Sequence, residues 1–305
     1  MNKIRIDGKL AHRLVATQFP QWKNLSIQAV ADQGWDNRTF RLGEQMLVRL
    51  PSAERYAQQV EKEHRWLPKL APFLPLRIPV PVAMGESADN YSWRWSIYRW
   101  LEGEPATSAP IENLSDLAKS LAEFLLALQR IDAAGGPLAG PQSFYRGGTL
   151  ANYDAQLRRA LDILKGKIDV DVATKIWEAA LATVWQEAPV WVHGDVSPTN
   201  LLVRENKLNA VIDFGQLTIG DPACDLTITW TLFQGESREL FRSMFPFDAA
   251  TWTRARAWTL WKFVIAAAGL TSWNALGTTR SWEIIEDVLA DHQCKDRVVI
   301  SIRKL

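Results

Sequence analysis

The sequence predicts an α+β fold in two parts, a strand-rich part formed by residues 1–101 and a mainly helical part formed by residues 102–305. Short segments that alternate apolar and polar residues, as half-buried strands do, are concentrated before Glu102. Longer segments with apolar residues three and four positions apart dominate after it. The stretch from Trp191 to Asp225 reads as loop, strand, turn, strand and loop, and it carries closely spaced acidic and amide side chains.

Composition excludes several classes of protein. The chain has 305 residues, of which 47% are hydrophobic and 23% charged, and its formal net charge is +1, so no strongly basic surface for nucleic acid is expected. No window offers about 20 uncharged apolar residues, and the first residues lack the apolar segment of a signal peptide. Two cysteines do not suggest a disulfide framework. We expect a cytoplasmic protein without nucleic-acid or membrane partners, and its oligomeric state stays open.

The first part contains one prominent helix among short strands. Helical spacing predicts helices, and alternation or proline-extended backbone predicts strands. The predicted helices are Lys9–Phe19 and Pro51–Leu70; the strands are Leu25–Ala31, Phe40–Leu42, Met46–Leu50 and Trp93–Leu101, with Ile78–Val82 extended. A turn is expected over Asp32–Asn37, and Glu102–Pro105 is expected to break the last strand.

Arg49 is a cation in an otherwise apolar strand. Two carboxylates of the following helix, Glu61 and Glu63, are available to pair with it, and Glu63 shares the apolar stripe that faces inward. Burying a single charge would cost several kcal/mol, so we expect an Arg49–Glu63 pair.

The second part is expected to be helical on both sides of the central stretch. Helical periodicity is found in Ile111–Ile131, Asn152–Leu164, Val172–Trp185, Ala223–Phe233, Glu239–Phe245, Ala249–Leu270 and Ser281–His292. Six tryptophans belong to this C-terminal region: Trp230, Trp252, Trp258, Trp261, Trp273 and Trp282. Such residues could line a pocket for a cation, but packing in a helical core is the favoured interpretation.

Three residues of the central stretch suit phosphoryl transfer. Asn200 and Asp213 offer a neutral and an anionic oxygen, the ligands that Mg²⁺ prefers when nucleotide phosphates complete its shell. Asp195 is then free to accept the proton of an attacking hydroxyl. His193 is expected to pack and hold the loop, while Asp221 and Asp225 are expected to cap the following helix and anchor the loops.

The motif H-G-D-V-S-P-T-N, followed by I-D-F-G and G-D-P-A-C-D-L, resembles the aminoglycoside phosphotransferase and choline kinase superfamily, which is similar to protein kinases. The resemblance implies a bilobal protein-kinase-like fold, with a nucleotide-binding lobe at 1–101 and a catalytic, acceptor-binding lobe at 102–305. It also implies that ATP or GTP is bound with Mg²⁺.

The same resemblance assigns roles in nucleotide binding. Gly34 lies where the family has its nucleotide-covering loop, and Arg49 and Glu63 fall where the phosphate-binding lysine and its helix partner are expected. The Arg99 carbonyl and the Leu101 amide would hold the purine at the hinge. Arginine at position 49 is a departure that changes a point charge into a planar fork. A covering loop poor in glycine is a second departure.

The leading hypothesis is a Mg²⁺-dependent kinase that phosphorylates a hydroxyl of a small molecule, with an aminoglycoside antibiotic as the first acceptor to try and antibiotic resistance as the role. Choline, another amino alcohol, a sugar and a macrolide remain alternatives. A nucleotide-binding pseudokinase is the alternative from another class. A protein kinase is disfavoured because no A-P-E-like segment follows Asp213, and G-x-S-x-G, H-E-x-x-H and G-x-x-x-x-G-K are absent.

Overall fold

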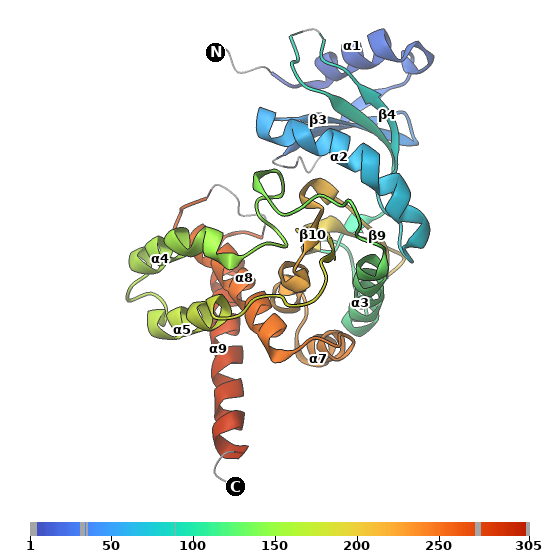
Figure 1. The fold of residues 1–305 in the computed structure, drawn as a ribbon. Coiled ribbons are helices and arrows are strands. Elements are labelled where there is room, and N and C mark those ends of the chain that lie inside the picture. The colour runs from blue at the N-terminus through green and yellow to red at the C-terminus, as the bar shows by residue number, and fades with distance from the viewer. Residues whose placement is uncertain (1–4, 31–33, 35, 89, 272–275, 303–305) are drawn as a thin grey trace.

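A computed structural model describes residues 5–30, 34, 36–88, 90–271 and 276–302, with the side chains of residues 294–302 excepted. The strand-rich part lies above the helical part (Figure 1). It contains an antiparallel sheet of five strands in the order β1-β2-β3-β5-β4. Their bounds are β1 Ile27–Ala29, β2 Asn37–Leu42, β3 Met46–Pro51, β4 Pro81–Gly85 and β5 Trp95–Arg99.

Two helices accompany this sheet. Helix α1 (Gly8–Gln18) buries Leu10, Leu14 and Val15 in a core shared with the strands. Helix α2 (Glu54–Leu70) lies between the sheet and the helical part in Figure 1, and Trp66, Leu67 and Leu70 belong to the larger core of the helical part. Helix α2 therefore carries side chains from the sheet towards the central loops.

The helical part surrounds two small sheets. Its helices are α3 Leu114–Arg130, α4 Asp154–Ile163, α5 Val170–Leu181, α6 Ile228–Thr231, α7 Gly235–Ser243, α8 Ala249–Ala267 and α9 Thr278–Ile302. One sheet has the order β6-β8-β9, with β6 Glu104–Pro105, β8 Leu201–Arg204 and β9 Lys207–Val211. The other pairs β7 (Val190–Val192) with β10 (Thr218–Gly220). Within the described residues, no helix is long and apolar enough to cross a membrane.

The sequence missed three short strands. As expected, β5 ends before Glu102–Pro105, but Glu104–Pro105 also forms the short strand β6, where Glu104 pairs with Val203. Strands β7 and β10 lie in segments that read as loops. Segments of two or three residues are too short to show alternation, so only tertiary pairing reveals them. The predicted turn at Asp32–Asn37 falls partly outside the described residues, and Asn37 already belongs to β2.

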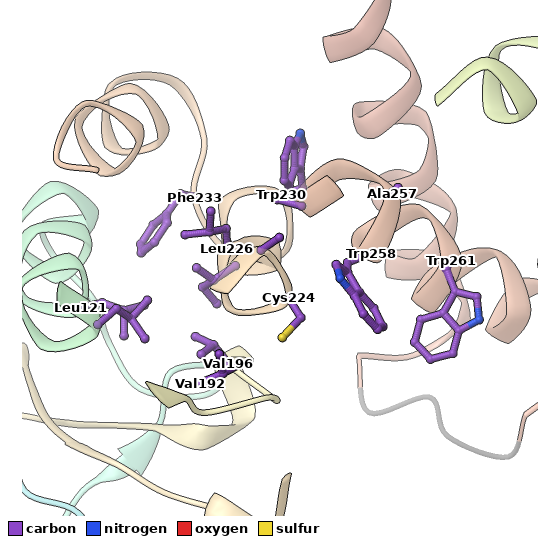
Figure 2. Packing of buried hydrophobic residues seen from close by; sticks show 14 of the residues in the cluster. Leu121, Val192, Val196, Cys224, Leu226, Trp230, Phe233, Ala257, Trp258 and Trp261 are labelled. Carbon is purple, nitrogen blue, oxygen red and sulfur yellow. The ribbon is translucent and has the colours of Figure 1, made fainter. Parts of the chain in front are cut away.

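Helix α8 is the central helix of the second part, because nearly its whole circumference is buried. Figure 2 shows Trp258 of this helix facing the segment that carries Cys224 and Leu226. The predicted packing of tryptophans in the core is confirmed for Trp230, Trp258 and Trp261, which are 1%, 1% and 5% exposed. Trp273 lies outside the described residues.

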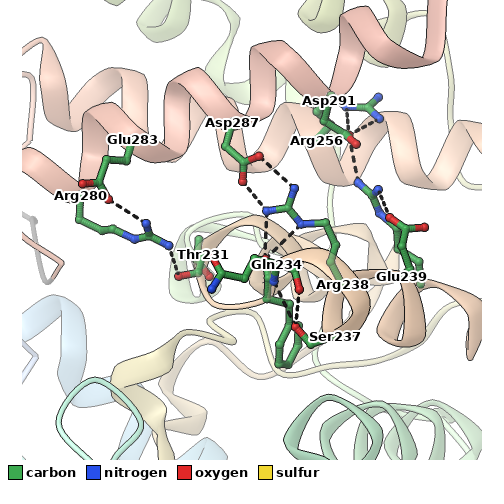
Figure 3. A network of polar contacts seen from close by, with 12 residues as sticks. Thr231, Gln234, Ser237, Arg238, Glu239, Arg256, Arg280, Glu283, Asp287 and Asp291 are labelled. Atoms are coloured by element: carbon green, nitrogen blue, oxygen red, sulfur yellow. Dashed lines mark hydrogen bonds and ion pairs between the residues drawn. The ribbon is translucent and has the colours of Figure 1, made fainter. Parts of the chain in front are cut away.

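Buried arginines tie the C-terminal helix to the body (Figure 3). Arg238 of α7 pairs with Asp287 of α9, and Arg256 of α8 pairs with Asp291 of α9 at 2.7 Å. Arg256 is 4% exposed, and a buried charge is tolerated when an opposite charge neutralises it. These pairs fix α9 against α7 and α8.

Candidate active site

A buried carboxylate holds the loop between β7 and β8. The Asp225 oxygens accept hydrogen bonds from the backbone N–H groups of His193 and Gly194, each at 2.8 Å. Burial raises the pKa of Asp225 to about 7, although these two N–H groups oppose the rise. The His193 ring accepts from the Asp195 N–H at Nδ1 and donates from Nε2 to the Ile212 carbonyl at 3.0 Å, which assigns the neutral Nε2–H tautomer. The expectation that His193 and Asp225 hold the loop is confirmed.

Gly194 permits a close approach of two loops. Its φ is +88°, and a Cβ atom there would lie 2.6 Å from the Gln216 carbonyl oxygen. Any side chain would therefore both clash and strain the backbone. The glycine of H-G-D brings Asp195 next to the turn that follows β9.

Asp195 faces a lysine of the central helix. Lys262 Nζ donates to Asp195 Oδ1 at 2.7 Å, and the Asp195 side chain is 16% exposed. Burial raises the pKa of Asp195, but Lys262 and Arg146 outweigh it, so this pKa lies below its ordinary value. Asp195 is therefore an ionised carboxylate at neutral pH, available to a hydroxyl.

Asn200 is hydrogen-bonded to Asp195 and to Ile212, the residue before Asp213. Asn200 Nδ2 donates to the Asp195 carbonyl at 3.0 Å, which leaves the amide oxygen as an acceptor. The Ile212 N–H donates to the Asn200 carbonyl at 2.9 Å, so the end of β9 lies against this loop. Asp213 has a left-handed φ of 67°, a conformation that aspartate tolerates better than most residues and that often marks functional sites.

The donor set fits Mg²⁺. Asn200 offers a neutral oxygen and Asp213, whose side chain is 36% exposed, an anionic one. Within the described residues, no cluster of three or more His, Cys, Asp or Glu could hold a metal ion by itself. Mg²⁺ suits such a sparse set because it keeps waters and takes further oxygens from substrate phosphates.

Arg49 links the sheet to the metal-site candidates. Its Nη1 donates to both carboxylate oxygens of Glu63 at 3.3 Å, and its Nη2 donates to Asp213 Oδ1 at 3.0 Å. Burial opposes the charge, but Glu63 and Asp213 outweigh it and raise the pKa of Arg49. The Tyr98 hydroxyl also donates to Glu63. The predicted Arg49–Glu63 pair is confirmed, whereas Glu61 pairs with Arg94.

Helix α2 contributes two further contacts that the sequence did not suggest. Lys62 Nζ donates to the Gly215 carbonyl at 2.7 Å, and burial lowers the pKa of Lys62 to about 8. Gln59 donates to Asp36 at 3.2 Å. Burial, together with the nearby charge of Asp213, raises the pKa of Asp36 to about 6. The turn after β9 is thus bound to α2 at several points.

The segment Arg99–Leu101 begins at the last residue of β5, and two of its backbone N–H groups are hydrogen-bonded on opposite sides. Trp100 donates its N–H to the Gln45 carbonyl at 2.8 Å, and Arg99 donates its N–H to Val80 on the opposite side. Because backbone groups alternate along an extended chain, the Arg99 carbonyl and the Leu101 N–H face away from Gln45.

Gly34, the remaining nucleotide-binding candidate, is exposed. Its carbonyl accepts a hydrogen bond from Arg38 Nη1 at 2.7 Å. Among the described residues, Gly34, Arg99 and Leu101 share no ion pair or side-chain hydrogen bond with the group formed by Asp195, Asn200, Asp213, Arg49 and Glu63. Their assignment stays a prediction.

Sequence reasoning missed two cations beside Asp195. Lys262 lies in the apolar run of α8, and Arg146 lies in a loop rich in glycine. A charge within an apolar helix was the available signal for Lys262. Nothing local distinguishes Arg146 from a solvated loop arginine, yet it is only 8% exposed.

The site and the two-part fold define a phosphotransferase of the kinase-like class. The sequence profile of the phosphotransferase enzyme family (APH) matches residues 27–258, and the chain belongs to this family. None of the curated protein sequences gives a significant match.

Solved structures confirm the predicted bilobal kinase-like fold. The GDP complex of aminoglycoside 2'-phosphotransferase-IIIa matches with a TM-score of 0.71 at 20% identity, covering 94% of this chain and 99% of the other. The gentamicin complex of APH(2")-IIa matches at 0.59 and 23% identity, with 95% and 97% covered. Macrolide 2'-phosphotransferase MphH from Brachybacterium faecium matches at 0.59 and 21% identity, with 92% and 97% covered. At these identities the likeness concerns the fold.

Proposed function

We propose that this phosphotransferase moves the γ-phosphoryl group of ATP or GTP to a hydroxyl of a small molecule, with Mg²⁺ as cofactor. The acceptor oxygen forms a bond to the γ-phosphorus, and the bond from that phosphorus to the β,γ-bridging oxygen breaks, releasing nucleoside diphosphate. The hydroxyl proton passes to Asp195. The observation that carries the proposal is a chain of contacts: Asn200 is hydrogen-bonded to the backbone of Asp195 and to that of Ile212, and the next residue, Asp213, pairs with Arg49.

Each side chain has a distinct role in the proposal. Asn200 and Asp213 hold Mg²⁺, which neutralises phosphate charge when bound. Arg49, braced by Glu63, contacts the nucleotide phosphates. Residues 1–101 form the nucleotide lobe, with Gly34 in the covering loop and the Arg99–Leu101 segment at the purine. Residues 102–305 supply the catalytic loop and bind the acceptor.

Aminoglycosides are the first acceptors to test, because aminoglycoside phosphotransferases share the fold. Macrolides follow for the same reason. Choline, other amino alcohols and sugars complete the panel.

The deciding experiment measures nucleoside diphosphate release by the purified chain with Mg²⁺, ATP or GTP, and each acceptor. The matched variant is Asp195→Asn, which keeps the shape of the side chain and removes the base. We expect acceptor-dependent release to fall by about 10³-fold while nucleotide affinity stays within about twofold. A wild-type chain that binds nucleotide but phosphorylates nothing in the panel would favour a pseudokinase.

A further inference from the structure

Arg146 is a nearly buried cation beside the catalytic loop. Its guanidinium carbon lies 5.0 Å from the ring centre of Trp258 and 4.8 Å from that of Trp261, both on α8. On its other side, a Cβ atom at Gly194 would lie 3.1 Å from the Arg146 Cβ. The arginine therefore sits between the central helix and the residue that precedes Asp195.

Among the described residues, no carboxylate forms a direct ion pair with Arg146, although its charge helps to lower the pKa of Asp195. Its one side-chain hydrogen bond runs from Nε to Gln216 Oε1 at 3.0 Å. A guanidinium has five N–H donors, so four of them lack a protein acceptor in the described chain. Contact with tryptophan rings orients the group without neutralising it. A side chain that is 8% exposed and keeps these donors is prepared for an anion.

A second cation lies on the same side of Asp195. Lys262 follows Trp261 directly on α8, and its ammonium group donates to Asp195 at 2.7 Å. Two other acidic residues nearby, Asp225 and Asp221, do not neutralise Arg146. Asp225 is fully buried with both oxygens occupied by backbone N–H groups, and Asp221 pairs with Arg254 at 2.6 Å.

Lys262 and Asp195 neutralise each other, so Arg146 adds a positive charge that disfavours a polycation beside the hydroxyl-binding carboxylate. We infer that the acceptor carries an anionic group, a carboxylate or a phosphate, and that Arg146 binds it while Asp195 holds the hydroxyl. The inference rests on the proposed function, because it concerns the acceptor of the same reaction. It names an acidic hydroxyl compound, such as a hydroxy acid or a sugar acid, as the substrate class.

The first experiment compares matched acceptors on the wild-type chain. The pairs are glycerate with glycerol, gluconate with glucose, and glucose 6-phosphate with glucose, and kanamycin serves as the polycation. Equilibrium binding is measured by calorimetry with Mg²⁺ and a non-hydrolysable nucleotide, and kcat/KM by nucleoside diphosphate release. We expect the anionic member of at least one pair to be preferred by about tenfold or more. Equal binding within every pair, or a preference for kanamycin, would overturn the inference.

The second experiment tests the arginine itself. Arg146→Gln should reduce the preference for the anionic member to about one, and Arg146→Lys should retain part of it because the charge remains. The control is Arg65→Gln, which removes an exposed arginine that lies over Trp66 at 5.0 Å. This control should leave the preference unchanged. Thermal melting and nucleotide affinity show whether each variant is folded, and the wild-type preference does not depend on any variant.

A third measurement separates the two sources of an anion at Arg146. If the anion is the acceptor's own group, Arg146→Gln reduces transfer to the anionic acceptor by a larger factor than the slow acceptor-free hydrolysis of nucleotide. If that hydrolysis falls as much as transfer does, Arg146 contacts the transferred phosphoryl group and the acceptor assignment is wrong. Anionic compounds that bind without any turnover would contradict the proposed function, and the acceptor assignment would fall with it, whereas turnover without an anionic preference would overturn this inference alone.

Discussion

The two sides of the candidate active site each contain a buried arginine, but the groups that surround the two arginines differ. On the nucleotide side, Arg49 is surrounded by carboxylates, with Glu63 at 3.3 Å and Asp213 at 3.0 Å. On the acceptor side, Arg146 lies against two tryptophan rings and donates to one neutral amide oxygen. Carboxylates neutralise the charge of Arg49 before any ligand binds, whereas aromatic rings hold Arg146 without neutralising its charge. The comparison supports our proposal that the two sides bind different ligands, a metal-bound nucleotide near Arg49 and an anionic acceptor near Arg146.

The largest expected effect concerns the carboxylate of the nucleotide side. Asp213→Asn removes the anionic metal ligand and keeps the size of the side chain. Mg²⁺-dependent nucleotide affinity should fall by at least about 100-fold, because the loss of a direct ligand exceeds the 10–100-fold typical of an outer-shell change. Calorimetry with and without Mg²⁺ measures this, and acceptor affinity should change little. If Mg²⁺ still strengthens nucleotide binding to the same extent, Asp213 is not the metal ligand.

A comparison of stabilities would sharpen the contrast between paired and unpaired arginines. Glu63→Gln leaves Arg49 buried with one carboxylate fewer, so the free energy of unfolding should fall by about 3 kcal/mol. Arg146→Gln leaves no carboxylate without its ion-pair partner, so the free energy of unfolding should fall by only about 1 kcal/mol. Urea unfolding of both variants at pH 7 measures the difference. An equal decrease in the free energy of unfolding would show that Arg146 stabilises the fold as much as the Arg49–Glu63 pair does. The contrast between the two sides would then fail.

The smallest expected effect concerns the protonation of Asp195. Lys262 lowers the pKa of Asp195, so Lys262→Met should raise this pKa towards and above its ordinary value. A carboxylate must be ionised to accept a proton, and the acidic limb of the kcat/KM profile should therefore move to higher pH. Nucleotide affinity serves as the control. An acidic limb that stays in place would mean that another group titrates there.

Much of the nucleotide side could be predicted from the sequence, because its residues lie in local patterns. Glu63 shares the apolar stripe of α2, so it had to face inward, and Arg49 was the charge available to meet it. Asp195 and Asn200 are close in sequence, and Asp213 ends the next strand of a hairpin, so β8 and β9 bring them together.

The acceptor side could not be predicted in this way. Arg146 and Lys262 are more than one hundred residues apart in the sequence, and neither belongs to a recognisable motif. Their proximity depends on where α8 packs against the catalytic loop, which is a consequence of the whole helical core. The short strands β6, β7 and β10 could not be predicted for the same reason, because they are defined by pairing with residues that are distant in the sequence.

The sequence by itself determined the order of the elements, the class of reaction and the group of residues that we propose for phosphoryl transfer. Local periodicity and closely spaced polar side chains carry that information. The tertiary structure alone decided which charges surround Asp195. Electrostatic interactions depend on the distance between charges and on their burial, and the local sequence predicts neither. In our proposal, the acceptor meets an arginine that lies against two tryptophan rings and a lysine that is paired with Asp195.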